Sequence, residues 1–564
     1  VLFRSLALSD RTDMCPRDIM VIHRRIIVTV LVLIVAFVSH AIDVQVTATG
    51  GLSGPGCGTT VIDACDSLKD AWSACQNSSS EPCNMYLQPG HYVGPNNAAL
   101  NFGSAVISIV GVDKSGSTIL DGEGSHSGFS STGNITLNGL VLQDYINSTL
   151  AWKPTISYSL LKVSNCTFVG NQGDKGGALL LQPTASTVTA AVNASFIGNV
   201  ANGYGGAIYA LASVDASNFT LKIGANAQFM NNIAAKSGDG HGGAISAHDY
   251  VTLTIGDSAQ FVNNIAAKSG DGYGGAISAH DYVTLTIGDS AHFVNNIAAK
   301  SGDGNGGALS VHDNATLTIG NNAQFVKNTA SKYGSGEGGA IYAEARDGYS
   351  NITLAIGKHA QFLSNAISVI GDGHGGGAIL IHAYGEFTNV TLTMGDNALL
   401  MNNTAVVKGI GGGGGAIHAE THGDNASVAV AIGNDTQFVS NTAIVSGFGG
   451  GGAIYTFTAG DPSSLTLRLG DNTRFVNNAA IVNGTGGGGA IIAYAPGSPS
   501  NITIMIGDNV QFVNNSAFAS EGGLGGAVNA YASGDNSGVT LMIGDNARFA
   551  NNTAGGSENE EAGG

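Results

Sequence analysis

The sequence predicts an all-β protein built as a parallel β-helix, and three observations lead to that prediction. One sequence unit recurs from residue 168 to the end of the 564-residue chain. The spacing inside the unit is fixed in one segment and changes at a single point elsewhere. Short stretches of each unit alternate apolar and polar residues, as β-strands with one buried face do. Fixed-period repetition of this kind is typical of a solenoid.

Two motifs mark the repeating unit. The first is Gly-Gly-Ala followed by Ile, Leu or Val, with its alanines at Ala178, Ala207, Ala244, Ala276, Ala308, Ala340, Ala378, Ala416, Ala453, Ala490 and Ala527. The second is Phe-x-x-Asn, with Leu400 replacing Phe in one copy, and it ends at Asn171, Asn199, Asn232, Asn264, Asn296, Asn328, Asn365, Asn403, Asn441, Asn478, Asn515 and Asn552.

The spacing separates the wall of the solenoid from its loops. Each unit from Gly224 onward also has a glycine directly after an Ile, Leu or Met, and Gly256 is one example. This glycine always lies 8 residues before the Asn that ends the next Phe-x-x-Asn motif. The distance from the motif alanine to this glycine is 12 residues in three copies and 17 in the others. A five-residue difference confined to one place predicts a surface loop on one side of a regular stack.

Each unit contains three short segments with a period of two. In Ala259–Val262 and Leu253–Ile255 the alternate positions stay apolar while the residues between them vary among copies. In Gly243–Ala247 the Ile and the second Ala recur, and the residue between them changes. Three strands per coil, stacked by parallel pairing, satisfy the backbone groups of each coil from the coils on either side.

Stacked coils bring equivalent residues into line along the axis, at ~4.8 Å per coil. We therefore expect an aromatic stack and a ladder of side-chain amides. These structural ladders comprise Phe229, Phe261, Phe293 and Phe325, and Asn232, Asn264, Asn296 and Asn328.

Residues 42–167 are predicted to form an N-terminal cap and irregular first coils, before the regular repeats of 168–564. The segment Cys65–Trp72 has the apolar spacing of one amphipathic helix, with Asp63 or Asp66 as a candidate N-cap. This helix would cover the first edge of the stack, which otherwise exposes unpaired strand groups.

Residues 1–41 are predicted to be a leader and not part of the fold. Val1–Ser5 resembles a translated sequencing adaptor, and Met20 is followed by Arg24 and Arg25, an apolar run and Ser-His-Ala. This pattern is typical of a secretory signal peptide. It predicts an extracellular or cell-surface protein, and sequons such as Asn314 fit glycosylation on that route.

The cysteines agree with export. Four of them fall within 27 residues, and an even cluster in an exported chain suggests two disulfides. The candidates are Cys57, Cys65, Cys75 and Cys83, and all three pairings remain open. Zinc is the weaker reading, because no Cys-x2-Cys pair is present.

Composition excludes two other classes of protein. Lys and Arg number 22 against 40 Asp and Glu, a net charge of −18, so we expect no nucleic-acid partner. Hydrophobic residues make up 43% of the chain, too many for a disordered protein.

The Gly-Gly-Ala-Ile and Phe-x-x-Asn repeats resemble those of the chlamydial polymorphic membrane proteins (Pmp). The resemblance implies a right-handed, pectin-lyase-like parallel β-helix and a surface adhesin without catalytic residues. It implies an extracellular protein or glycan as partner, and membrane attachment only through a C-terminal region that this chain lacks. Side chains at the variable loop, such as Tyr349, Glu386, His422 and Tyr455, would make weak multivalent contacts.

Three other functions are alternatives to adhesion, namely catalysis, calcium binding and ice binding. The pairs His248-Asp249, His280-Asp281 and His312-Asp313 are candidates for a polysaccharide lyase or hydrolase, but a loop copied three times favours solvated turn residues. No cofactor is expected, although Asp239, Asp271 and Asp303 are weak calcium candidates. Outward Thr-x-Thr pairs also resemble the faces of ice-binding solenoids.

Overall fold

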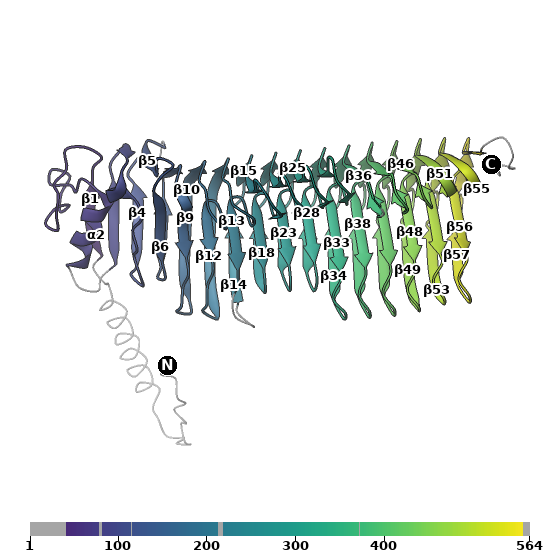
Figure 1. Cartoon of the computed structure of the whole chain (residues 1–564), viewed down its shortest axis with the longest axis horizontal. Helices are drawn as coiled ribbons and strands as arrows, with labels where there is room; N and C mark the ends of the chain where they lie inside the picture. The colour runs from purple at the N-terminus through teal and green to yellow at the C-terminus, as the bar shows by residue number, and fades with distance from the viewer. Residues whose placement is uncertain (1–40, 78–81, 114–115, 213–217, 372, 557–564) are drawn as a thin grey trace, which may run out of the picture.

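The computed structural model describes residues 41–77, 82–113, 116–212, 218–371 and 373–556. These residues form a straight rod of stacked coils, with the N-terminal region at one end and the last coil at the other (Figure 1). All strand pairings between named strands are parallel, and the right-handed parallel β-helix is confirmed. The predicted leader lies outside the described residues.

The predicted capping helix is present at the N-terminal end of the rod. Helix α2 (Leu68–Gln76) buries Leu68 and Ala71 against the first coils, which include β1 (Ile42–Val46) and β2 (Cys83–Leu87). Its N-cap is Ser67, whose side chain accepts a hydrogen bond from the Asp70 N–H, so the expectation of an Asp63 or Asp66 cap was wrong. A hydroxyl at this position satisfies a free amide of the first turn as well as a carboxylate does.

One coil of the regular region shows how the sequence motifs form strands. The three predicted segments are β19 (Val251–Ile255), β20 (Gln260–Val262) and β23 (Ile277–His280). Two further short strands lie between β20 and β23, namely β21 (Ile265–Ala267) and β22 (Gly272–Tyr273). The same order recurs in the neighbouring coils, with one-to-one register between equivalent residues.

The wall that matters for function is a sheet of 13 strands among the described residues. Its members are β6 (Ser127–Ser131), β9 (Ile146–Trp152), β11 (Leu179–Leu181), β13 (Ile208–Leu211), β18 (Ile245–His248), β23, β28 (Leu309–His312), β33 (Ile341–Ala345), β38 (Ile379–Ala383), β43 (Ile417–Thr421), β48 (Ile454–Thr458), β52 (Ile491–Ala495) and β56 (Val528–Ala532). We call this sheet the loop-side wall, because the loop of variable length follows each of its strands.

The length variation falls in an exposed turn. In the shorter copies, β18 ends at His248 and β19 begins three residues later at Val251, after a tight turn. In the longer copies, β33 extends to Ala345, and residues 346–349 are exposed before β34 (Asn351–Ile356) begins.

The ladder residues line the interior of the rod. Phe261, Phe293 and Phe325 stack with ring centroids 4.8 Å apart and are fully buried. The Asn264 side-chain amide donates to Asn296 Oδ1 at 3.0 Å and to the Phe229 carbonyl at 2.9 Å. The same bonds join the other members of the two ladders, Phe229, Asn232, Asn296 and Asn328 included.

The outer face of the loop-side wall is covered, which simple alternation did not predict. Ser278, Tyr342 and His418 occupy its outward positions and are almost fully buried. They lie beneath glycine-rich arms, by which we mean the segments that lead into each strand of this wall. One example is residues 373–378, which come after β36 (Ala366–Val369) and before β38. Glycine is required where an arm touches the wall: a Cβ at Gly412 would lie 2.4 Å from the Tyr455 ring.

Candidate functional site

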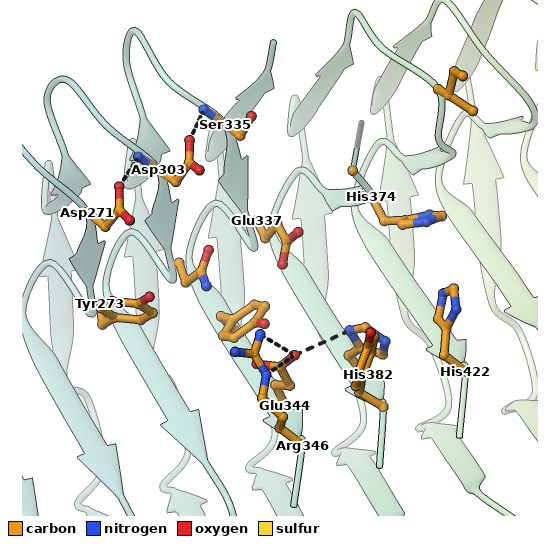
Figure 2. Close-up of a pocket in the computed structure, with 15 residues that line it drawn as sticks. Asp271, Tyr273, Asp303, Ser335, Glu337, Glu344, Arg346, His374, His382 and His422 are labelled. Atoms are coloured by element: carbon orange, nitrogen blue, oxygen red, sulfur yellow. Dashed lines mark hydrogen bonds and ion pairs between the residues drawn. The ribbon is translucent and has the colours of Figure 1, made fainter. Parts of the chain in front are cut away.

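A polar groove lies between the arms and the loop-side wall. Its volume is about 770 Å3, and residues from five successive coils line it. The lining residues are Asp271, Tyr273, Asp303, Asn305, Ser335, Glu337, Tyr342, Glu344, Arg346, Gly373, His374, His382, Tyr384, Ile410 and His422. Figure 2 shows how the labelled side chains converge from the arms and from the wall.

The wall contributes a ladder of ionisable residues to this groove. The parallel register places His312 beside Glu344, Glu344 beside His382, and His382 beside Glu420. Each strand alternates, so these side chains point outward while their neighbours, such as Ala343, pack in the core. Glu344 and Glu420 are 3% and 1% exposed, which is rare for carboxylates unless they have partners.

Glu344 is paired with a cation at the edge of the groove. The Arg346 guanidinium reaches back along the same strand and contacts Glu344 Oε1 at 3.1 Å (Figure 2). Burial raises the pKa of Glu344, although Arg346 opposes that effect. His312 Nδ1 lies 3.7 Å from Glu344 Oε2, so this carboxylate faces a cation or an imidazole on both sides.

Glu420 is surrounded by imidazoles. His418 Nε2 lies 2.9 Å from Glu420 Oε2, and His374 Nδ1 lies 3.3 Å from the same oxygen. His382 Nδ1 lies 3.3 Å from Glu420 Oε1, and His422 Nε2 lies 3.7 Å from Oε2. Burial alone would raise the pKa of Glu420, but the histidines outweigh it and hold that pKa well below the usual value.

Two arms bring further ionisable groups over the wall. Glu337, on β32 (Gly336–Glu337), is half-buried, and its desolvation raises its pKa to about 8. His374, just before β37 (Gly375–Gly376), projects into the groove. An aromatic pocket of about 250 Å3 adjoins the groove, sharing His374 and Ile410 with it.

The His-Asp pairs that were considered for catalysis are arranged in rows. The rings of His248, His280 and His312 stack with centroids 5.0 Å and 4.3 Å apart. Burial lowers the pKa of all three histidines, that of His312 to about 3. They are the last residues of β18, β23 and β28, so the expectation of solvated turn histidines was wrong. The arms above the wall remove water from positions that would otherwise face solvent.

The weak calcium candidates form backbone contacts between coils. Asp239 Oδ1 accepts the Asp271 N–H at 3.0 Å. In the same way Asp271 Oδ1 accepts the Asp303 N–H at 2.9 Å, and Asp303 Oδ1 accepts the Ser335 N–H at 2.8 Å (Figure 2). In the described part of the chain, these three carboxylates do not gather into a cluster that could hold a cation. Asp271 and Asp303 instead line the far end of the groove.

The structure resolves the open question of cysteine pairing. Cys57 is bonded to Cys65, and Cys75 to Cys83, so each disulfide closes a local loop next to the capping helix. Cys166 is a buried free thiol. These residues lie at the N-terminal end of the rod, far along the chain from the groove.

Sequence reasoning missed most of the groove residues, although one signal was present. His418-Ala-Glu420-Thr-His422 places its three polar residues at alternate positions of one strand, and therefore on one face. Of these three residues, His422 alone was named in advance, as a loop residue, and elsewhere in the groove Asp271 and Asp303 were named as calcium candidates. Tyr455, expected to be an accessible contact residue, is 1% exposed beneath an arm, so that expectation was wrong.

The coils, the ladders and the covered outer wall define a repeat protein of the parallel β-helix class. Residues 193–211 and 322–344 match the sequence model of the Chlamydia polymorphic membrane protein (Chlamydia_PMP) repeat, so these two segments are similar to repeats of that family. No curated protein matches the sequence.

A comparison with solved structures adds little. The chain is similar to a PL6 family alginate lyase, AlyGC, at 8% identity, over 88% of this chain and 99% of that one. The TM-score of 0.24 is too low to support a conclusion about this protein. Among the helices in the described ranges, none is long and apolar enough to cross a membrane.

Proposed function

We propose that this chain is an exported, non-enzymatic β-helical rod at the cell surface that binds an extended extracellular glycan along the groove. The repeat family supports a surface role, since its members are described as membrane proteins. The side chains that line the groove support a more specific role, which is adhesion to a ligand bound in the groove.

One observation carries the proposal: five successive coils line a single groove in the direction of the rod axis. At ~4.8 Å per coil, such a groove spans on the order of 20 Å and suits a linear chain of several sugar rings. Tyr273 and Tyr384 offer flat apolar surfaces for ring faces, while Asn305 and Arg346 offer hydrogen bonds to hydroxyl groups.

The charge of the groove limits which class of glycan it can bind. Asp271, Asp303 and Glu344 are carboxylates, and Arg346, the one Lys or Arg among the lining residues, is paired with Glu344, so the groove keeps an excess of negative charge. Unscreened negative charge in a groove repels a polyuronate or sulfated chain. We therefore propose a neutral or amino-sugar polymer as the ligand.

A glycan array probed with the purified chain tests this proposal. We expect binding to neutral or amino-sugar polymers, and an approximately tenfold or greater loss of affinity in Tyr384→Ala and in Arg346→Ala. The matched control is Tyr349→Ala, because Tyr349 is 72% exposed and is not among the groove residues. Binding only to a protein partner, or equal affinities in all variants, would overturn the glycan proposal.

Catalysis is the second candidate, and one observation favours it. The pKa of Glu337 is raised to about 8, and Glu344 lies in the same groove beside Arg346. Two carboxyl groups in one groove, one of which keeps its proton at neutral pH, are part of the pattern that glycan hydrolysis requires. Release of reducing ends from a bound glycan, abolished in Glu337→Gln, would replace the binding role with an enzymatic one.

A further inference from the structure

The imidazoles around Glu420 form a cluster with the donor atoms of a metal site. One nitrogen each of His374 and His422 and one carboxylate oxygen of Glu420 all lie within 4.8 Å of one another. Glu420 and His422 come from one strand and its end, while His374 comes from the arm above. Figure 2 shows His374 and His422 next to each other at one end of the groove.

We propose that His374, Glu420 and His422 bind a divalent transition-metal ion such as Zn2+. Two imidazoles and one carboxylate are a donor set that suits Zn2+ and its neighbours in the first transition row. Ca2+ and Mg2+ prefer oxygen donors only, so this site differs in kind from the aspartate positions considered from the sequence. The proposal is independent of whether the groove binds a glycan.

The separations of the donor atoms match a common central ion. Ligands about 2.0 to 2.2 Å from a tetrahedral ion lie about 3.4 Å from one another. Glu420 Oε2 lies 3.3 Å from His374 Nδ1 and 3.7 Å from His422 Nε2. The Glu420 oxygen therefore already lies at separations close to those of coordination from both histidine nitrogens, which themselves lie within 4.8 Å of each other.

Two of these atoms also lack a satisfactory partner within the described chain. Glu420 Oε2 and His374 Nδ1 are buried, and neither makes a hydrogen bond of good geometry to another described residue, although His418 Nε2 lies 2.9 Å from Oε2. A buried carboxylate oxygen whose neighbouring donors are poorly aligned is costly, because its desolvation is only partly compensated. An ion bound between the two atoms would remove that cost.

Two other histidines position the carboxylate without binding the ion. His418 Nδ1 accepts the Gly375 N–H at 3.2 Å, so the proton of its neutral ring is on Nε2, which faces Glu420 Oε2. His382 Nδ1 lies 3.3 Å from the other oxygen, Oε1. Contacts of this kind to a ligating carboxylate fix its orientation and strengthen metal binding.

The site is open on the groove side. The side chains of His374 and His422 are 25% and 29% exposed, whereas Glu420 is 1% exposed. Three protein ligands and an accessible face leave room for a water molecule or a hydroxyl group of a bound molecule, as in zinc sites that keep one position free.

Metal binding by the full chain tests the proposal directly. After treatment with a chelator, we expect one Zn2+ per chain by calorimetry, and a visible absorption band of four-coordinate Co2+ when Co2+ is added instead. His422→Ala and His374→Ala should each lower the Zn2+ affinity by about 10-fold to 100-fold or more. Excess Ca2+ should not compete.

The controls separate this site from other histidines and from loss of fold. His359→Gln removes an exposed histidine outside the groove and should leave affinity and stoichiometry unchanged. Since His374 and His422 are partly exposed, their variants should keep the circular dichroism spectrum of the wild type, even if Glu420→Gln fails to fold. Absence of stoichiometric binding at micromolar Zn2+, or wild-type affinity in both histidine variants, would overturn the proposal. Either result leaves the glycan test unaffected, because only the metal is the probe.

Discussion

Replacing one asparagine of the amide ladder tests whether hydrogen bonds between the stacked side chains stabilise the rod. The Asn264 side chain makes four hydrogen bonds: it donates to Phe229 and Asn296, and its Oδ1 accepts from the backbone and side-chain N–H groups of Asn232. In Asn264→Ala the buried Asn232 N–H loses this acceptor. Four bonds at about 1 kcal/mol each, with a buried donor left unpaired, predict a loss of about 3 to 5 kcal/mol.

The assay is urea unfolding, together with hydrogen exchange at the Asn232 amide. The matched control is Asn263→Gly, because Asn263 is exposed and has a positive φ of 57° that glycine adopts without strain. We expect the control to change the free energy of unfolding by less than about 0.5 kcal/mol. If Asn264→Ala came within 1 kcal/mol of that control by the same measurement, the ladder would not be a main source of stability.

Three further predictions concern the aromatic stack, the neutral histidines and the loop. Phe293→Ala removes a fully buried ring and should lower the free energy of unfolding by about 3 to 5 kcal/mol, whereas Phe387→Ala, at a ring 42% exposed, should cost far less; equal urea midpoints would contradict this. Because burial lowers the pKa of His312 to about 3, only the unfolded chain takes up its proton between pH 6.5 and 3, so stability falls on acidification by up to ~1.4 kcal/mol per pH unit. His312→Gln should flatten that part of the stability–pH curve, and an unchanged slope would refute the assignment. Five Gly/Ser residues inserted after Tyr282, where the longer copies have their extra turn, should leave the circular dichroism spectrum and melting temperature nearly unchanged, whereas the same insertion after Gly288 should disrupt the fold.

The repeated part of the fold was predictable because each ladder position carries the same residue in many copies. Recurrence at Phe293 and Asn296 revealed strand, register and buried face together, since stacking requires like residues in line. The disulfide pairing was not predictable, because four cysteines allow three pairings and spacing does not choose among them. Of the two predicted N-caps, Asp66 lies one residue and Asp63 four residues before the observed cap Ser67, and composition does not decide among them because Asp and Ser are both good caps.

The groove was missed for a different physical reason. The alternation of apolar and polar residues predicts which side chains of a strand point away from the core. It does not predict whether another segment of the chain covers those side chains. The glycine-rich arms pack on the outer face of the loop-side wall, so Tyr455 and His418 become buried although their pattern is that of exposed positions. Close approaches such as that of Gly412 to the Tyr455 ring explain why glycine recurs in the arms.

A unique site in a repetitive rod needs positions at which neighbouring coils differ, and charge restricts how they differ. At ~4.8 Å between coils, two like charges in a partly buried ladder repel by about 3 kcal/mol. The observed order Glu344, His382, Glu420 places an imidazole between two carboxylates and avoids that repulsion. The next coil ends the series with Phe457, so the ionisable ladder is confined to a few coils. The groove therefore forms where the ladder stops repeating. The stacking of coils that stabilises the rod also positions the ionisable side chains of this region.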